Sequence, residues 1–438
     1  MLHTLKKIYD KLPKQYLRFL KYIPDKVLFG NSYNEWKSKV SFDKSIIEKN
    51  LLETLVYARE NTQYGKEHIP KNLTLENVKE VLESLPLVSS YDLSTNLDYF
   101  ISKEFKGANS YLTTTGGTGR NPTSILLSNK SFGIEWAHMH HIWSFAEYKK
   151  SKDLKLTLRG KSLKGNRLVE FNPIYNELVV DTFKVKDSNF KEFLKEIKNY
   201  DIKYIHGYPS LLKEFMVYFE KYNYKPNIKG VFLGSEGATI EDKKLITSFF
   251  NCKVIHWYGQ SEKVTLAVDI DANDMFRVYT SYGYPRVVDD ELVATSFVNR
   301  ALPLINYKVG DGAEIIEDDK YIYIKNIQSR RGKDFVYLNK DKKISTTAIN
   351  LHSQIQNEIL YYQIHQKEFA KINIKVLQKQ TSKMNSNELV KIFGDEIRAN
   401  LKDFEIDVRL VNEEEIQKSH RGKMILLVQE INLNNGEY

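Results

Sequence analysis

The sequence predicts an α/β fold, with a large N-terminal α/β domain that includes a β-rich subdomain and a small α+β C-terminal domain. Helix and strand patterns alternate over residues 187–259, short strand patterns occupy residues 291–325, and a second set of strands and helices follows residue 334. A chain of 438 residues is also too long for one compact core. We therefore expect two domains, at residues 1–331 and 332–438.

The composition narrows the class of protein. Cys252 is the single cysteine, which excludes an intrachain disulfide and a cysteine zinc site and fits a reducing cytoplasm. No apolar run approaches the ~20 residues needed to span a bilayer, and the first residues lack a signal-peptide core. The net charge is +9. The lysines that produce it are scattered along the chain and mixed with acidic residues, without an arginine-rich tract. We expect a cytoplasmic protein with a solvated basic surface and no nucleic-acid partner.

The first 40 residues predict a basic helical segment. Apolar residues recur at helical spacing on both sides of Pro13, and seven basic residues lie among them: Lys6, Lys7, Lys11, Lys14, Arg18, Lys21 and Lys26. Such a segment can make a peripheral contact with the inner membrane surface, or it can pack on the protein body with its lysines in water. We favour packing on the body.

The central region predicts a parallel sheet. The expected elements are a helix from Asp187 or Ser188, a strand at 202–207, a helix capped by Ser210, a strand at 228–234, a helix capped by Thr239 with Asp242, and a strand at 253–258. Strands that alternate with helices pair in parallel, and functional residues then gather at their carboxyl ends. Polar motifs follow all three strands, which predicts a ligand crevice there.

The later elements are shorter. Residues 291–325 predict antiparallel strands with Gly-Asp-Gly and Asp-Asp-Lys turns. The C-terminal part predicts a hairpin that turns at 339–342, a helix over 355–365, a strand at 372–376, a helix over 387–401, a strand at 406–411 and a terminal strand at 424–428.

One loop carries the clearest chemical signal. Three threonines, three glycines and a basic residue meet in the sequence Thr114-Thr115-Gly116-Gly117-Thr118-Gly119-Arg120. Glycine amides can approach a polyphosphate closely, and threonine hydroxyls donate hydrogen bonds to its oxygens. The loop is not a Walker motif. On its own it fits an ordinary turn as well as a phosphate site.

Taken in order, the motifs resemble the adenylate-forming superfamily, and within it the phenylacetate–CoA ligase-like branch that includes capsular polysaccharide biosynthesis proteins. The resemblance covers nearly the whole chain and rests on the loop at 114–119 and on the motifs at 234–238, 258–262, 307–311 and 331–334. It implies the adenylate-forming fold with a small mobile C-terminal domain. It also implies that ATP activates a small carboxylic acid to an acyl-adenylate, and that the acyl group passes to an acceptor, by default coenzyme A.

The resemblance also implies residue roles. The loop of Thr114, Thr115, Gly116, Gly117, Thr118 and Gly119 would hold phosphates, and Gly234, Ser235 and Glu236 would run along the adenine. In the next motif Tyr258 and Gly259 would contact the adenine, Ser261 the α-phosphate, and Glu262 would bind Mg²⁺. Asp311 would accept both ribose hydroxyls, Arg331 would contact the ribose, Asp334 would be the hinge, and Lys423 would be the catalytic lysine.

Three departures from the usual motifs stand at Gly117, Asn121 and Val309. They keep open a second hypothesis, a degenerate nucleotide-binding scaffold without catalysis. A third is an enzyme that transfers the acyl group to an amine or hydroxyl acceptor in surface-polysaccharide synthesis. Retention of Glu262, Asp311 and Lys423 favours catalysis.

The acid-binding pocket is predicted from the same resemblance. Its candidates lie on the helix after the phosphate loop and near the next strand ends: Trp136, His138, His140, His141, Phe145 and Tyr208. The three histidines would fit a metal site or a packed aromatic helix. We favour the packed helix, because no carboxylate or cysteine stands at ligand spacing.

Overall fold

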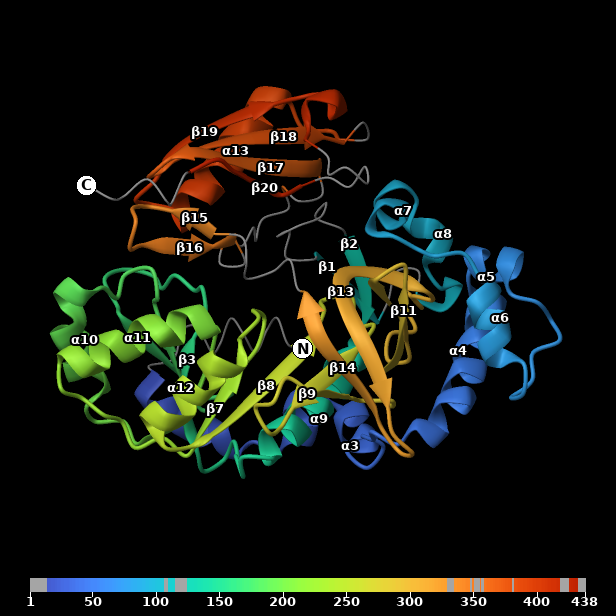
Figure 1. Ribbon diagram of the computed structural model, residues 1–438, viewed down its shortest axis with the longest axis horizontal. Helices are drawn as coiled ribbons and strands as arrows, with labels where there is room; N and C mark the ends of the chain where they lie inside the picture. The colour runs from blue at the N-terminus through green and yellow to red at the C-terminus, as the bar shows by residue number, and fades with distance from the viewer. Residues whose placement is uncertain are drawn as a thin grey trace.

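The computed structural model describes residues 14–105, 109–114, 124–328, 335–346, 349, 355, 358–379, 382–417 and 425–431. One sheet of twelve strands runs through the large part of the chain, in the order β11-β12-β13-β14-β10-β9-β8-β7-β6-β3-β5-β4. A separate four-stranded sheet forms the C-terminal part and lies above the large part in Figure 1.

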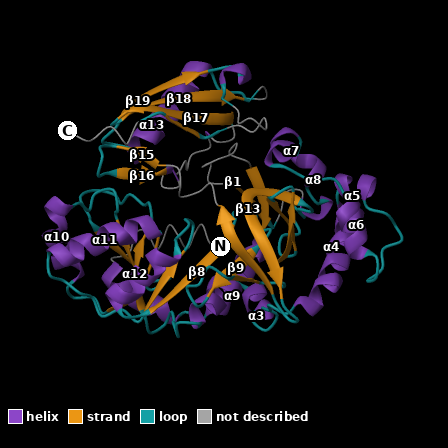
Figure 2. Ribbon diagram, viewed as in Figure 1, coloured by secondary structure: helices purple, strands orange, loops and turns teal. Residues whose placement is uncertain are grey.

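The strands of the central region pair in parallel, as predicted. The parallel strands are β3 (Leu154–Leu158), β5 (Glu177–Val180), β6 (Ile202–Gly207), β7 (Gly230–Leu233) and β8 (Lys253–Gly259). An edge strand, β4 (Val169–Asn172), pairs antiparallel with β5. The connecting helices are α10 (Phe190–Ile197), α11 (Pro209–Lys221) and α12 (Ile240–Phe250), which lie together beside these strands in Figure 2.

Alternate strand residues enter two different cores. Ile205 and Val231 pack in one cluster with apolar residues of α10, α11 and α12. Their neighbours Tyr204 and Phe232 pack in another with α9 (Asn129–Ser144). Because successive side chains of a strand point to opposite faces, this division places α9 on the face opposite the other three helices.

The two predicted helix caps have different outcomes. Thr239 and Asp242 form the capping box of α12, as predicted. The prediction that Ser210 caps α11 is wrong. The helix begins at Pro209, two residues earlier than that cap implies, and the N-cap is Tyr208, which makes no side-chain cap bond. Proline suits the first helical position because its missing N–H has no partner there in any case.

The antiparallel strands continue the same large sheet. They are β9 (Leu266–Asp269), β10 (Phe276–Val278), β11 (Gly283–Val288), β12 (Glu291–Ser296), β13 (Tyr307–Glu317) and β14 (Ile322–Gln328). The predicted turn at Asp318 joins β13 to β14. The predicted Gly-Asp-Gly turn instead lies inside β13, where Gly310 has φ +87° and the register shifts next to Gly312. Positive φ and a register shift are features of a bulge.

Helices of the N-terminal region pack against the antiparallel part, where Leu51 and Leu55 share a core with Leu292. These helices are α4 (Ile47–Asn61), α5 (Gln63–His68), α6 (Val78–Ser84), α7 (Ser90–Thr95) and α8 (Leu97–Phe100), whereas α2 (Asp25–Phe29) and α3 (Asn31–Trp36) pack on α9. They precede an antiparallel hairpin of β1 (Ser110–Thr114) and β2 (Ser124–Ser128).

The basic segment is described from Lys14 onward. A 3₁₀ helix, η1 (Lys14–Tyr22), carries Leu17 on a buried side, while Phe19 and Tyr22 are exposed. The Lys150 ammonium donates to the carbonyl of Ile23 at 3.2 Å, so the segment contacts the body. Among the described residues, no helix is both long enough and apolar enough to cross a membrane.

The C-terminal part begins with the predicted hairpin, β15 (Phe335–Tyr337) and β16 (Lys343–Ser345). Next come β17 (Ile359–Glu368), β18 (Lys371–Gln378), α13 (Ser386–Asn400), β19 (Glu405–Leu410) and β20 (Leu427–Gln429). The strand at 372–376, the helix over 387–401 and the strand at 406–411 are therefore confirmed.

The prediction of a helix over 355–365 is wrong, because β17 occupies most of that range. Ile355, Ile359 and Tyr362 recur at helical spacing and enter one core, which mimics an amphipathic helix. Tyr361 is also fully buried, in a cluster on Val411 and Ile416. A strand buried on both faces gives a continuous apolar run instead of an alternating one.

Candidate functional site

A cavity of about 800 Å³ lies at the carboxyl ends of β6, β7 and β8. Residues of α9 form one wall, and Asp311 of β13 lies at another. Phe335 and Lys343 of the C-terminal hairpin also line the cavity, so both parts of the chain contribute to it. The position is the crevice that the α/β pattern predicts.

The predicted adenine motif, Gly234 to Glu236, lies in the loop after β7. Gly234 lies against the indole of Trp257, and a Cβ atom there would come within 2.4 Å of the ring. Ser235 has φ +68° and lines the cavity. Glu236 is buried, and its Oε2 accepts a hydrogen bond from the backbone N–H of Ser210 at 3.2 Å. The loop is thus tied to the start of α11.

Tyr258 and Asp311 meet in the cavity wall. The Tyr258 hydroxyl donates a hydrogen bond to Asp311 Oδ2 at 2.7 Å, across 53 residues of sequence. Both residues line the cavity, together with Gly259 and Ser261. The hydrogen bond fixes a carboxylate beside an aromatic ring. Such a carboxylate can accept hydrogen bonds from the hydroxyl groups of a ligand.

Glu262 lies behind this wall and is not among the residues that line the cavity. Its side chain is buried, and Oε1 accepts a hydrogen bond from the Tyr307 hydroxyl at 3.1 Å. Its Oε2 is buried without a hydrogen-bond partner among the described residues. An uncompensated carboxylate oxygen is a suitable ligand for a hard cation.

Of the predicted acid-pocket residues, Trp136 lines the cavity. Its ring stacks on Phe29, at 4.7 Å, and on Tyr175, at 5.0 Å. His141 and Phe145 do not line the cavity: His141 Nδ1 lies 2.8 Å from the Tyr279 hydroxyl, and Phe145 packs on the His141 ring at 5.1 Å. 

Tyr208 likewise lies outside the lining residues. Its ring is 5.7 Å from the guanidinium of Arg159, which does line the cavity. Tyr208 therefore does not line the cavity itself. It packs on Arg159, which does.

The other two histidines of α9 are packed. His138 Nδ1 donates to the carbonyl of Ile134 at 2.9 Å, and burial lowers its pKa to about 4. His140 Nδ1 lies 2.7 Å from the Tyr33 hydroxyl, and burial lowers its pKa to about 4 as well. The structure thus gives α9 the predicted aromatic packing.

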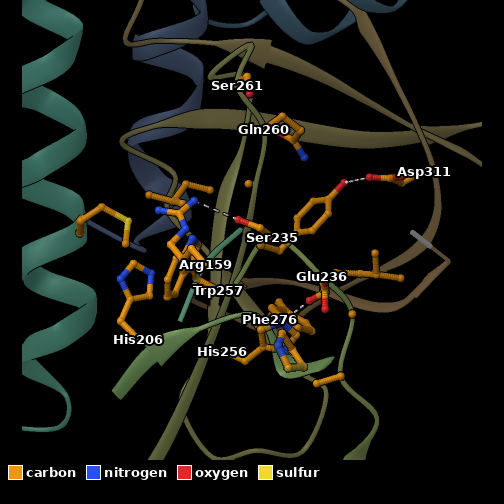
Figure 3. A pocket seen from close by; sticks show the side chains of 18 of the residues that line it. Arg159, His206, Ser235, Glu236, His256, Trp257, Gln260, Ser261, Phe276 and Asp311 are labelled. Atoms are coloured by element: carbon orange, nitrogen blue, oxygen red, sulfur yellow. Dashed lines mark hydrogen bonds between the residues drawn. The ribbon is translucent and has the colours of Figure 1, made fainter. Parts of the chain in front are cut away.

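Some cavity residues were given no role by the sequence motifs. Arg159 follows β3 and His206 stands near the end of β6, both outside the motifs, and Gln260 follows β8 inside the motif at 258–262. Figure 3 shows Arg159 and His206 close together, with Asp311 on the opposite side. Their shared signal is position, since each stands at or just after the carboxyl end of a parallel strand.

The remaining predicted residues lie outside the part of the chain that the structure describes. They are Thr115, Gly116, Gly117, Thr118, Gly119, Arg331, Asp334 and Lys423. Thr114 ends strand β1, but its side chain is not described. The paired ends of β1 and β2, at Thr114 and Ser124, bracket the predicted phosphate loop.

Comparison with solved structures identifies the fold. The chain matches 2-hydroxyisobutyryl-CoA ligase in complex with 2-HIB-AMP and CoA with a TM-score of 0.53, at 14% identity, over 89% of this chain and 90% of that one. A second structure of that ligase, in the postadenylation state with R3-HIB-AMP, matches with a TM-score of 0.50, at 15% identity, over 88% and 89%. This chain has the adenylate-forming ligase fold.

Sequence comparison agrees. The chain is 22% identical over 343 residues to Protein CapK of Staphylococcus aureus, which covers 72% of this chain and 74% of that protein. No protein-family profile matches the chain. The two comparisons confirm the predicted resemblance to the adenylate-forming superfamily and its capsule-related branch.

Proposed function

We propose that this protein activates a carboxylic acid with ATP and transfers the acyl group to coenzyme A. In the first step a carboxylate oxygen attacks the α-phosphorus of ATP, which forms the acyl-adenylate and releases pyrophosphate. In the second step the thiol attacks the acyl carbon and AMP leaves. The observation that carries the proposal is the cavity with the Tyr258–Asp311 pair, set in an adenylate-forming ligase fold.

The nucleotide would occupy the side of the cavity at Asp311. Adenine would lie along Gly234, Ser235 and Glu236 and against Tyr258, with Gly259 close by. Asp311 would accept hydrogen bonds from the ribose hydroxyls, because an ionised carboxylate has hydrogen-bond acceptors and no donor. Its hydrogen bond from Tyr258 supports this role, since it orients the carboxylate before the nucleotide binds.

The phosphates would extend toward Ser261 and the glycine–threonine loop. Glu262 would hold Mg²⁺, which when bound neutralises phosphate charge. The buried Oε2 without a described hydrogen-bond partner supports this assignment. Arg331 would add a contact to the ribose.

The two domains, residues 1–331 and 332–438, would move relative to each other about Asp334. In one position Lys423 would lie between the substrate carboxylate and the α-phosphate. These two anions repel, and a desolvated cation placed between them lowers the barrier to their meeting. Phe335 and Lys343 line the cavity from the C-terminal side, which supports a functional contact between the two parts.

A second acceptor class follows from the similarity to Protein CapK. In a capsule-related enzyme, the acceptor would be an amine or a sugar hydroxyl. The two acceptor classes are separated by measuring free coenzyme A with a thiol reagent during turnover. Loss of the free thiol supports thioester formation. Acyl-adenylate formation without loss of the thiol supports an amine or hydroxyl acceptor.

The proposal is tested by pyrophosphate release from purified protein with Mg-ATP and a panel of carboxylic acids. We expect release that depends on the acid and is lost in Asp311→Asn. ATP binding without release for any acid would favour the non-catalytic nucleotide-binding scaffold.

A further inference from the structure

One side of the cavity carries polar groups that the proposed nucleotide roles do not use. Arg159, His206 and Trp257 gather there, across from Asp311 (Figure 3). Trp136 and Trp143 of α9 line the same cavity. This side is where the acyl group would lie, so its chemistry bears on which acids fit.

The His206 imidazole packs against aromatic rings, and its side chain makes no hydrogen bond with another described residue. Its imidazole lies 5.2 Å from the Trp257 ring and 5.7 Å from the Trp143 ring, measured between centroids. It is 7% exposed, and Nδ1 is buried without a hydrogen-bond partner among the described residues. A buried polar atom left without a partner is costly, which favours a ligand or water that supplies one.

His206 is also uncharged. Burial, and then the positive charges of Arg159 and Lys155, lower its pKa well below the usual value. At neutral pH the ring therefore has one N–H donor and one acceptor nitrogen. It can recognise a hydroxyl or a carbonyl through hydrogen bonds without attracting a charge.

Arg159 supplies the charge on this side. Its guanidinium makes one long hydrogen bond, from Nη2 to Ser235 Oγ at 3.5 Å, and forms no ion pair with a described acidic residue. Two of the other cations that line the cavity are neutralised. Lys213 pairs with Asp242 at 2.7 Å, and Lys263 pairs with Glu135 at 2.9 Å.

Glu135 and Lys263 neutralise each other, so neither is available to bind a charged ligand group. Burial would raise the pKa of Glu135, but Lys263 and the Tyr282 hydroxyl lower it below the usual value, so the carboxylate is charged and already satisfied. Among the described groups in this wall, those left to interact with a ligand are His206, Arg159 and the indole N–H of Trp143, which is buried without a described hydrogen-bond partner.

We propose that His206 and Arg159 form a specificity subsite that selects acids whose acyl chain carries a further oxygen, as a hydroxyl, carbonyl or second carboxylate. The proposal rests on the proposed ligase function and adds the substrate class. An unsubstituted alkyl or aryl acid would leave both groups without partners in a buried site. A site built for hydrogen bonding discriminates strongly against analogues that lack the group.

The test compares matched acids in the pyrophosphate assay. Butyrate and hexanoate are each paired with hydroxylated, keto and dicarboxylic acids of the same carbon skeleton, and benzoate is paired with hydroxybenzoates. We expect kcat/KM to favour at least one oxygen-bearing series by about tenfold or more, the effect of one well-made hydrogen bond.

Three variants assign the preference to its residues. His206→Phe keeps a flat ring of similar size and loses no described hydrogen bond, so it should fold, with the preference for hydroxyl and keto acids reduced to near unity. Arg159→Met should act mainly on dicarboxylic acids. Lys213→Met removes a cation from the same cavity that is already paired, so it should leave the preference unchanged. Thermal unfolding checks the fold of each variant.

Two results would overturn the subsite. One is equal use of plain and oxygen-bearing acids by the wild-type protein. The other is an equal loss with all acids in Arg159→Met and His206→Phe, which would place these residues on the reacting carboxylate or on the nucleotide.

Failure of the ligase function can be told apart from failure of the subsite. If no acid releases pyrophosphate, the same acid pairs are titrated calorimetrically into protein saturated with AMP. Oxygen-selective binding that His206→Phe abolishes would uphold the subsite while the ligase proposal falls. Binding without that selectivity, or no binding, would overturn the subsite too.

Discussion

Tyr258 makes a short polar contact in the cavity wall. Its hydroxyl reaches Asp311 at 2.7 Å from a different part of the sheet, so a phenol on β8 controls the orientation of a carboxylate on β13. The ring and the hydroxyl then have separable roles. The ring offers a flat apolar surface, and the hydroxyl prepares an acceptor.

Tyr258→Phe tests this separation. The variant keeps the ring and loses the hydrogen bond, so we expect ATP to bind about fivefold more weakly, as for the loss of about 1 kcal/mol. Isothermal titration calorimetry measures the affinity. Tyr218→Phe is the matched control, because it removes a tyrosine–carboxylate bond, to Glu214, from a residue that does not line the cavity. Equal affinities in wild type and Tyr258→Phe would refute the role of the hydroxyl.

Glu262 differs from Asp311 in being behind the cavity wall, with one oxygen bonded to Tyr307 and the other without a described hydrogen-bond partner. Glu262→Gln retains an acceptor for the Tyr307 hydroxyl but removes the negative charge. We expect intact folding and a higher Mg²⁺ concentration for half-maximal ATP turnover. A magnesium titration of pyrophosphate release provides the measurement, and an unchanged curve would rule out Glu262 as the ligand.

Sequence motifs could locate these residues only in part. Tyr258 and Asp311 belong to motifs with a family likeness, and the structure brings them together. Arg159 and His206 belong to no motif, because their role depends on which strands are neighbours in the sheet. The order β8-β7-β6-β3 sets that neighbourhood, and a single sequence predicts it poorly.

Secondary-structure elements were predictable where local rules decide them. The capping box of α12 depends on residues three apart, and the α/β alternation on short apolar runs. The strand β17 was not predictable in this way, because its burial between α13 and the Val411 cluster is a tertiary property. The same holds for Gly310, whose turn-like sequence serves a bulge inside β13.

The cap of α12 also bears on the cavity, because Thr239 ends the loop that begins at Gly234 and lines the cavity from Ser235 onward. We expect Thr239→Ala to lower the free energy of unfolding by about 1 kcal/mol, measured by urea denaturation. Ser210→Ala is the matched control: Ser210 makes no side-chain cap bond, and its backbone N–H still donates to Glu236. A similar loss in both variants would contradict the cap assignment.

The C-terminal part has its own core, formed by α13 and the sheet β19-β18-β17-β20. A part with a separate core can move as a unit. Because interdomain contacts would break in each catalytic cycle, we expect limited proteolysis to cut first near Asp334 and leave a stable N-terminal body of about 330 residues. Mass spectrometry of the fragments identifies the cut. A first cut near Gly207 or Gly234 would contradict the proposed domains.

The proposed rotation of the C-terminal part determines what Lys423 should do. If this lysine neutralises charge between carboxylate and α-phosphate, it serves adenylation alone. Losing one preorganised cation of this kind should slow adenylation by roughly 10²–10³-fold in Lys423→Ala. ATP binding should persist, because Asp311 and the glycine–threonine loop remain.

The second half-reaction separates this role from general damage. Supplied with ready-made acyl-adenylate, Lys423→Ala should transfer the acyl group at close to the wild-type rate, because the domain rotation has then carried the lysine away. Lys402→Ala, at an exposed lysine of the same C-terminal part, should leave both half-reactions unchanged. Equal loss in both would indicate a different role for Lys423. No loss in either would mean that the motif match is accidental, and the non-catalytic scaffold would become the better account of the molecule.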